Sequence, residues 1–136
     1  MRQSNALSQA YREIAERHLL AARLVAEGGL WEIVAFHAYH AFESVCCSAL
    51  AQARIEIPRV HTRKIEVFQH EFQAYGFQAD FLALSARLAL VRNMSLYPSS
   101  IPDVVAPSEL LLDEDVARLL VDVATIVNVL VNDLKL

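Results

Sequence analysis

Apolar residues recur at the three- and four-residue spacing of a helix along almost the whole chain, and no segment keeps the alternation of a half-buried strand. The 136 residues include only three Gly and four Pro, and three of the Pro lie between residues 97 and 108. We therefore expect an all-α protein. The prediction is a single domain over residues 1–136, an elongated up-and-down bundle of about five helices.

Helix-stop and helix-start residues divide the chain. Together with the apolar spacing they predict helices at residues 7–27, 30–55, 62–75, 79–95 and 113–134. Gly28-Gly29 is expected to end the first helix, Thr62 to cap the third and Asp113 to cap the last. Gly76 is expected to end the third helix, and residues 97–108 are expected to form a loop.

The first and last helices carry apolar sets that predict how they pack. The first should bury a face made up of Leu7, Tyr11, Ile14, His18, Ala21 and Val25. The last has a core stripe of Val116, Leu119, Leu120, Val123, Val127, Leu130 and Leu134. A second apolar set extends beyond that stripe: Val121, Ala124, Val129 and Val131. Such a helix is either central in its bundle or covered by a partner, and the positive mean hydropathy of +0.31 favours a dimer face.

The charge balance limits the ligands that the surface can attract. A net charge of −4 and a pI near 5.7 argue against a broad phosphate-binding surface. Four basic residues nonetheless lie within eleven positions: Arg54, Arg59, Arg63 and Lys64. They form either a solvated loop rim or a local basic strip on an acidic protein.

The two cysteines, Cys46 and Cys47, are adjacent, so a disulfide between them would be severely strained. Two cysteines also cannot supply a four-cysteine zinc site. Reduced thiols in a core are typical of cytoplasmic proteins. The chain shows neither a signal-peptide pattern nor eighteen uncharged apolar residues in a row, so we expect a soluble cytoplasmic protein without membrane contact.

The second predicted helix carries a possible set of metal ligands, because His37, His40 and Glu43 are spaced three residues apart. Metal sites in helical bundles draw their ligands from several helices. We therefore expect packed polar side chains at these positions, with no metal and no cofactor.

The strongest candidate site lies at the end of the fourth predicted helix, in the segment Arg92-Asn93-Met94-Ser95-Leu96-Tyr97-Pro98. Arg92 stands at the edge of the apolar stripe of this helix, where its guanidinium fork can hold a phosphate or a carboxylate. The alternative is an arginine that satisfies the last helical carbonyls or pairs with a nearby acid.

Three parts of the chain together resemble the HEPN (higher eukaryote and prokaryote nucleotide-binding) family of small helical bundles. Residues 35–43 are similar to the family's long helix of small and aromatic residues. His61-Thr62-Arg63-Lys64, with Phe68 and Phe72, is similar to its short helix. Arg92-Asn93 with Tyr97-Pro98 is similar to the signature at the end of its fourth helix. The resemblance implies a bundle that dimerises, with the signature arginine facing a cleft between subunits.

Many members of that family cleave RNA without metal, through an arginine followed by a histidine, and others work with a nucleotidyltransferase. Here Tyr97 occupies the histidine position, and no histidine follows His70. The chain is thus most similar to the Arg…Tyr sub-branch. A tyrosine with an ordinary pKa near 10 is a poor proton carrier at neutral pH.

The resemblance implies a homodimer that binds nucleotide or RNA phosphate between its subunits and acts with a nucleotidyltransferase partner in a toxin–antitoxin-like module. Arg92 would contact phosphate, Asn93 would hydrogen-bond to ligand or backbone, and Tyr97 would stack or donate its hydroxyl. Two alternatives stay open. One is a metal-independent endoribonuclease with Arg92 and Tyr97 as catalytic residues, and the other is a structural interaction bundle that uses its last helix.

Overall fold

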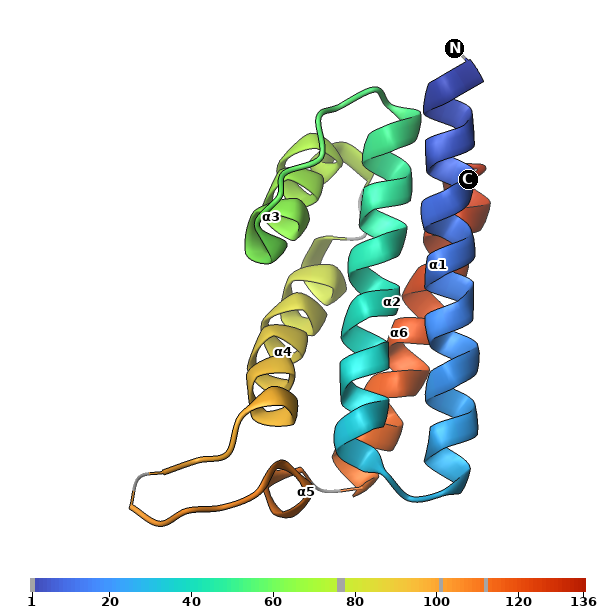
Figure 1. The fold of residues 1–136 in the computed structure, drawn as a ribbon. Coiled ribbons are helices and arrows are strands. Elements are labelled where there is room, and N and C mark those ends of the chain that lie inside the picture. Colours follow the sequence, from blue (N-terminus) through green and yellow to red (C-terminus); the bar gives the residue numbers. More distant parts are fainter. Residues whose placement is uncertain (1, 76–77, 101, 112) are drawn as a thin grey trace.

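The structure is a computed structural model that describes residues 2–75, 78–100, 102–111 and 113–136. Within these ranges the chain is helical and has no strand (Figure 1). The helices are α1 (Arg2–Glu27), α2 (Trp31–Gln52), α3 (His61–Glu71), α4 (Gln78–Leu96), α5 (Pro107–Leu110) and α6 (Asp113–Asp133), and a 3-10 turn, η1 (Gln73–Tyr75), follows α3. All but α5 exceed two turns, so the predicted all-α bundle of about five helices is confirmed.

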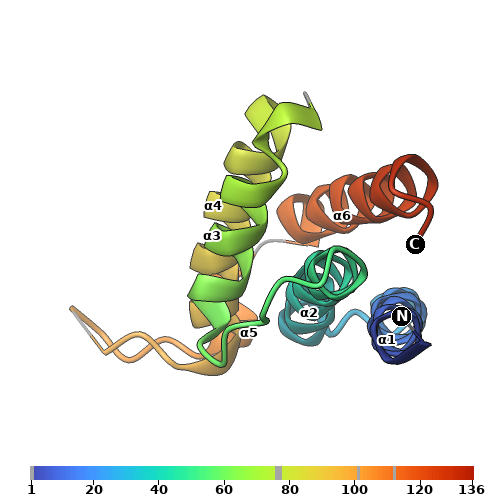
Figure 2. The same cartoon turned by 90° about the horizontal axis from the view of Figure 1, so that it is seen from above.

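The central helix is α2, which contacts α1, α3, α4 and α6. Seen from above, α1 and α6 lie on one side of α2, and α3 and α4 lie on the other (Figure 2). The long helices run up and down (Figure 1), and the 26 residues of α1 extend about 39 Å at 1.5 Å per residue. The bundle is therefore elongated, as its sequence predicts.

α2 is also the most apolar part of the fold. By length and hydropathy it could span a membrane, but 15 of its 22 residues are buried against other helices. Such burial is how the core helix of a globular bundle behaves. Cys46 and Cys47 are free thiols within this buried stretch. Burial raises the pKa of Cys46 and raises that of Cys47 to about 12, so both stay protonated, as predicted for reduced core thiols.

The helix ends follow the turn chemistry of the sequence. Gly29 adopts a left-handed φ of 72° and ends α1 as predicted. α2 ends at Gln52, three residues before the predicted end, because Arg54 takes a left-handed φ of 61°. The N–H of Ile55 then donates to the carbonyl of Leu50 at 2.9 Å, which closes the helix.

The buried face of α1 differs from the predicted one. The residues that are buried are Ser8, Ala15, Leu19 and Ala22, one position along from the predicted set. The Ser48 hydroxyl donates to the Ser8 carbonyl at 2.7 Å, and small side chains let α1 approach α2 closely. Leu7 and Ile14, predicted to be buried, are 47% and 42% exposed.

The structure also tests the predicted boundaries of α3 and α6. α3 begins at His61 rather than after Thr62, because the side chain of His61 is anchored on Glu43 of α2 and the extended Val60 supplies no side-chain cap. The predicted stop at Gly76 lies outside the described residues. Asp113 is the first residue of α6, and its carboxylate accepts the N–H of Glu114 at 2.8 Å.

The predicted loop at residues 97–108 is shaped by two local features. Ser99 and Val105 exchange backbone hydrogen bonds of 2.9 Å in an isolated bridge. The short helix α5 then begins inside the predicted loop, at Pro107, whose fixed φ suits a first helical position.

Phenylalanine rings join α3 and α4 to the central helix α2. Phe81 of α4 lies with its ring centroid 4.7 Å from that of Phe42 on α2 and 5.0 Å from that of Phe68 on α3. Phe68 in turn stacks on Phe72 at 4.8 Å. These contacts fix α3 and α4 against α2.

α6 buries most of its predicted stripe but is not the central helix. Its buried members are Val116, Leu119, Val123, Val127 and Leu130, and Leu120 and Leu134 are half-buried. Of the second apolar set, Val121 is 64% exposed, and Ala124, Val129 and Val131 are half-buried. Ala124 and Val131 pack against the core, so Val121 is the member of this set that faces outward from the single chain.

Candidate functional site

Arg92 projects from the last turns of α4 onto α2. Its guanidinium carbon lies 5.3 Å from the centre of the Tyr39 ring, within cation–π range. The Nε atom of Arg92 is buried and has no hydrogen-bond partner among the described residues. An unpaired buried donor costs about 1–3 kcal/mol, so this atom is the most conspicuous unsatisfied group of the site.

A buried carboxylate lies one turn along α2 from Tyr39. Glu43, 5% exposed, accepts from His61 Nδ1 at 2.8 Å and from Lys64 Nζ at 3.2 Å. Burial alone would raise the pKa of Glu43, but the hydrogen bonds from His61 and Lys64 and the charge of Lys64 outweigh it, and the pKa is lowered. Glu43 is therefore ionised, and its charge is neutralised by α3.

The Tyr39 ring links this ion pair to Arg92. Desolvation, followed by the charge of the nearby Glu43 carboxylate, raises the pKa of Tyr39 far above its usual range, and the Arg92 charge opposes this only in part. The phenol therefore stays neutral. It can offer its ring to the Arg92 guanidinium, but it cannot supply a tyrosinate.

The space beside Tyr39 is a cleft of about 300 Å³ between α3 and α4. Tyr39 is its only lining residue from α2, Thr62 and Ile65 contribute from α3, and Ala89 is its last lining residue on α4. Arg92 follows Ala89 by three residues, so it stands next to one end of the cleft.

The other two predicted site residues are exposed, whereas Arg92 is half-buried. Asn93 is exposed, and Tyr97 is 64% exposed at the end of α4. The backbone N–H of Tyr97 donates to the carbonyl of Asn93 at 3.2 Å, but across the described part of the chain no hydrogen bond joins the side chains of Arg92, Asn93 and Tyr97. Within one chain the three do not form a single site.

A cluster of histidines occupies the seam between α1 and α2. His18 and His37 approach through their Nδ1 atoms at 2.9 Å, and His40 stacks on His18 with ring centroids 5.4 Å apart. His40 also contacts Phe36, at 4.4 Å between centroids. Over the residues that the structure describes, no group of three or more His, Cys, Asp or Glu side chains is arranged to hold a metal ion.

The histidine cluster makes the stability depend on pH. Burial is the main cause that lowers the pKa of His18, of His37 and of His40. The pKa of His40 falls to about 4. There the charge of Glu43 opposes the shift, and the charges of His18, His61 and Arg92 add to it. As pH falls below 6.5, these histidines therefore bind more protons in the unfolded chain than in the folded chain. The stability contributed by neutral histidines is complete above pH 6.5 and is lost toward pH 4.

The midpoint of thermal unfolding should accordingly fall as pH drops from 6.5 to 4, and fall less steeply in His40→Gln. His70→Gln is the matched control, because the His70 side chain is 78% exposed. Differential scanning calorimetry across this pH range measures both slopes. Equal slopes for His40→Gln and wild type would show that His40 does not carry the effect.

Tyr39 was not predicted as a site residue, although the sequence carries one signal for it. Tyr39 precedes Glu43 by four residues, so the two share one face of α2. The His-x-x-Lys segment had been noticed only as part of a family resemblance. That Glu43 is its partner depends on how α3 packs, which spacing along the chain does not reveal.

Comparisons with known proteins agree with the fold. No significant match was found among curated proteins or among solved structures. A family model described as HEPN domain matches residues 8–134, which is nearly the whole chain and includes the Glu43–His61–Lys64 cluster and Arg92. The chain belongs to the HEPN domain family.

Proposed function

We propose that the protein binds the phosphate of a nucleotide or of RNA at Arg92. The observation that carries the proposal is the buried, unpaired Nε of Arg92 beside the α3–α4 cleft. A guanidinium donates paired N–H bonds to phosphate oxygens. A phosphate would therefore supply the acceptor that Arg92 Nε lacks.

The charges around Arg92 support an anionic ligand. The buried carboxylate one turn along α2 from Tyr39, that of Glu43, is already held by His61 and Lys64. It therefore has little negative charge left to cancel that of Arg92. A phosphate at Arg92 would also lie in a partly desolvated region, where ionic interactions are stronger than in bulk water.

The proposed assembly is a homodimer acting with a nucleotidyltransferase partner in a toxin–antitoxin-like module. Asn93 and Tyr97 are exposed at the end of α4, where they are free to meet a second subunit or a base. The exposed Val121 on α6 is consistent with a surface that a partner covers. In such a cleft Asn93 would hydrogen-bond to the ligand and Tyr97 would stack on it.

Metal-independent RNA cleavage with Arg92 and Tyr97 as catalytic residues is the second candidate, favoured by the same unpaired donor of Arg92, which can stabilise the charge that develops on phosphorus. His40 lies within the electrostatic influence of Arg92, but burial lowers its pKa to about 4, so it is a weak base at pH 7.

Arg92→Ala is expected to abolish the thermal shift that nucleotides induce. At a nucleotide concentration ten times the dissociation constant, binding should add about 1.4 kcal/mol to the wild type, or roughly 4 °C in the unfolding midpoint. Differential scanning fluorimetry with each nucleoside mono- and triphosphate measures it. Arg92→Lys should keep part of the shift because it retains the charge but loses the fork.

The control is Arg87→Ala on the same helix, whose arginine pairs with Asp122 at 2.7 Å and is 46% exposed. Equal shifts in wild type and Arg92→Ala would overturn the assignment. The same proteins incubated with RNA in EDTA separate the two candidates. Cleavage by wild type but not by Arg92→Ala supports the ribonuclease, and intact RNA in both samples leaves binding alone.

A further inference from the structure

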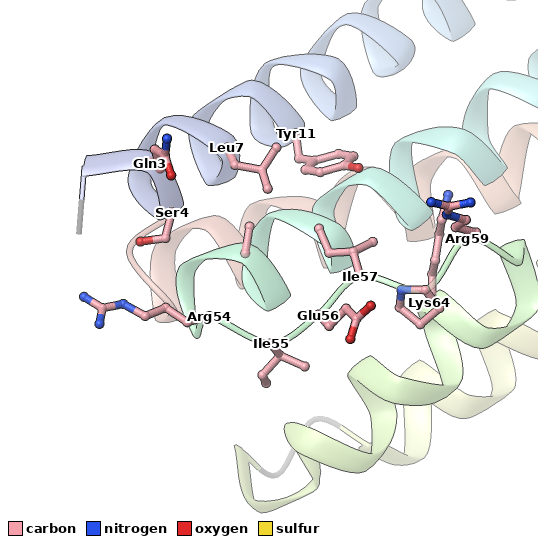
Figure 3. A pocket seen from close by; sticks show the side chains of 12 residues that line it. Gln3, Ser4, Leu7, Tyr11, Arg54, Ile55, Glu56, Ile57, Arg59 and Lys64 are labelled. Carbon is pink, nitrogen blue, oxygen red and sulfur yellow. The ribbon is translucent and has the colours of Figure 1, made fainter.

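A second hollow lies at the opposite end of α2 from the α1–α2 turn. The start of α1, the end of α2 and the segment after it enclose a groove of about 660 Å³, roughly twice the volume of the α3–α4 cleft (Figure 3). Its walls are aromatic and apolar, from Leu7 and Tyr11 of α1 and Ile57 of the connecting segment. Neither Arg92 nor Tyr97 lines it.

Cations stand at both ends of this groove. Arg54 lies at one end, and Arg59 and Lys64 lie together at the other (Figure 3). Lys64 is fixed by Glu43 at 3.2 Å, but neither Arg54 nor Arg59 has an acidic partner within the described ranges. Arg63, in the same basic strip, pairs with Glu66 at 2.9 Å and does not line the groove. The strip is thus divided into paired and unpaired arginines, and the unpaired ones line the groove.

The backbone at Arg54 is a second, independent observation. Arg54 holds the left-handed position, at φ 61°, that follows α2, and the hydrogen bond from Ile55 N–H to Leu50 O closes the helix around it. Glycine is the usual residue at this position because a side chain there is strained. The fold alone would favour glycine, so the arginine side chain at the groove end is not explained by stability.

We propose that this groove binds a segment of single-stranded nucleic acid, with one phosphate at Arg54 and another at Arg59 and Lys64. Between them a base would lie against Tyr11 and the apolar wall, since grooves for single strands combine backbone cations with stacking surfaces. A mononucleotide would satisfy only one end. The ligand class is that of the proposed function, but the residues are different, so the two proposals stand separately.

Glu56 lines the middle of the groove and affects which base fits there. Its carboxylate lies between the two cationic ends (Figure 3) and repels a phosphate there. A carboxylate accepts hydrogen bonds from the exocyclic amino groups of cytosine and adenine, which uracil and thymine lack. The groove therefore favours an amino-bearing base between the two phosphates.

The test measures the affinity of labelled octanucleotides, as RNA and as DNA of matching sequence, by fluorescence polarisation at 50, 100 and 200 mM salt. Arg54→Gly and Arg59→Gln should each weaken binding about three- to fivefold, as loss of an exposed charge pair does. Each should also reduce the slope of log affinity against log salt by about 0.7. Arg63→Gln removes the same charge nearby and should change affinity less than twofold.

Arg54→Gly also shows that lost binding is not lost folding. Because glycine relieves the left-handed strain, this variant should raise the unfolding midpoint by about 3 °C while it weakens binding. Equal affinity for RNA and DNA identifies backbone recognition, and tighter RNA binding adds a 2′-hydroxyl contact; both agree with the proposal.

Three results would overturn the proposal: no binding of octamers by wild type at 50 mM salt, equal losses in Arg59→Gln and Arg63→Gln, or unchanged affinity in Arg54→Gly and Arg59→Gln. The second result would mean that the oligonucleotide is attracted by the overall positive charge of the strip and does not bind in the groove. Failure here is distinct from failure at Arg92, which is measured with mononucleotides. If Arg92→Ala loses the nucleotide-induced thermal shift while the groove variants bind octamers normally, only the groove proposal is overturned.

Discussion

Replacement of Phe81 by alanine should destabilise the protein by about 3–5 kcal/mol, the usual cost of removing a buried phenylalanine. The Phe81 ring is 1% exposed and contacts Phe42 of α2 and Phe68 of α3. Its loss leaves a cavity where α3 and α4 meet α2. Since small domains are stable by only about 5–15 kcal/mol, the variant should lie near the limit of folding.

Urea denaturation followed by circular dichroism measures the change. Leu82→Ala is the matched control, because Leu82 neighbours Phe81 on α4 but is 49% exposed, and it should cost about 1 kcal/mol or less. Similar losses in the two variants would show that the aromatic contacts do not hold α4 in place.

Glu43→Gln should cost about 2–3 kcal/mol. The substitution keeps the size of the side chain but removes the charge that Lys64 and His61 share. Breaking a buried ion pair costs up to about 5 kcal/mol, and a smaller value is expected because the His61 side chain is 45% exposed. The helix that should loosen first is α3, whose first turn is anchored by this contact.

Denaturant unfolding at pH 7 measures this cost, and hydrogen exchange locates it. Glu71→Gln provides the comparison, because Glu71 pairs with His70 at 3.4 Å on an exposed surface and should matter by less than 0.5 kcal/mol. If Glu43→Gln is as mild as Glu71→Gln, the ion pair does not stabilise the docking of α3.

The sequence predicted the helices better than their faces. Helical periodicity and the pair at Gly28-Gly29 locate α1, but the apolar set around Leu7 and Ile14 pointed to the wrong side of it. Burial there is decided by the approach of two backbones at Ser8 and Ser48, and small residues leave no strong periodic signal. Propensity likewise extends α2 past Gln52, because nothing in its composition indicates that Arg54 adopts a left-handed conformation.

The candidate site shows the same division. Arg92 was identifiable as an arginine at a core edge, and it does lie against α2. Its neighbours Tyr39 and Glu43 come from a helix 49 or more residues earlier, so no local spacing links them to it. The sequence singles out Lys64 for its charge and for its place in the HEPN-like short helix, whereas its packed position makes it both a partner of Glu43 and a wall of the groove.

The contact between His18 and His37 couples the protonation of the two rings. With both Nδ1 atoms 2.9 Å apart, one ring must be the Nδ1–H tautomer and the other the Nε2–H tautomer. One added proton converts the donor ring to imidazolium and leaves the bond intact, since the other Nδ1 still accepts. A second proton places two N–H groups against each other. The pair therefore titrates in two coupled steps, and only the second breaks the hydrogen bond between α1 and α2.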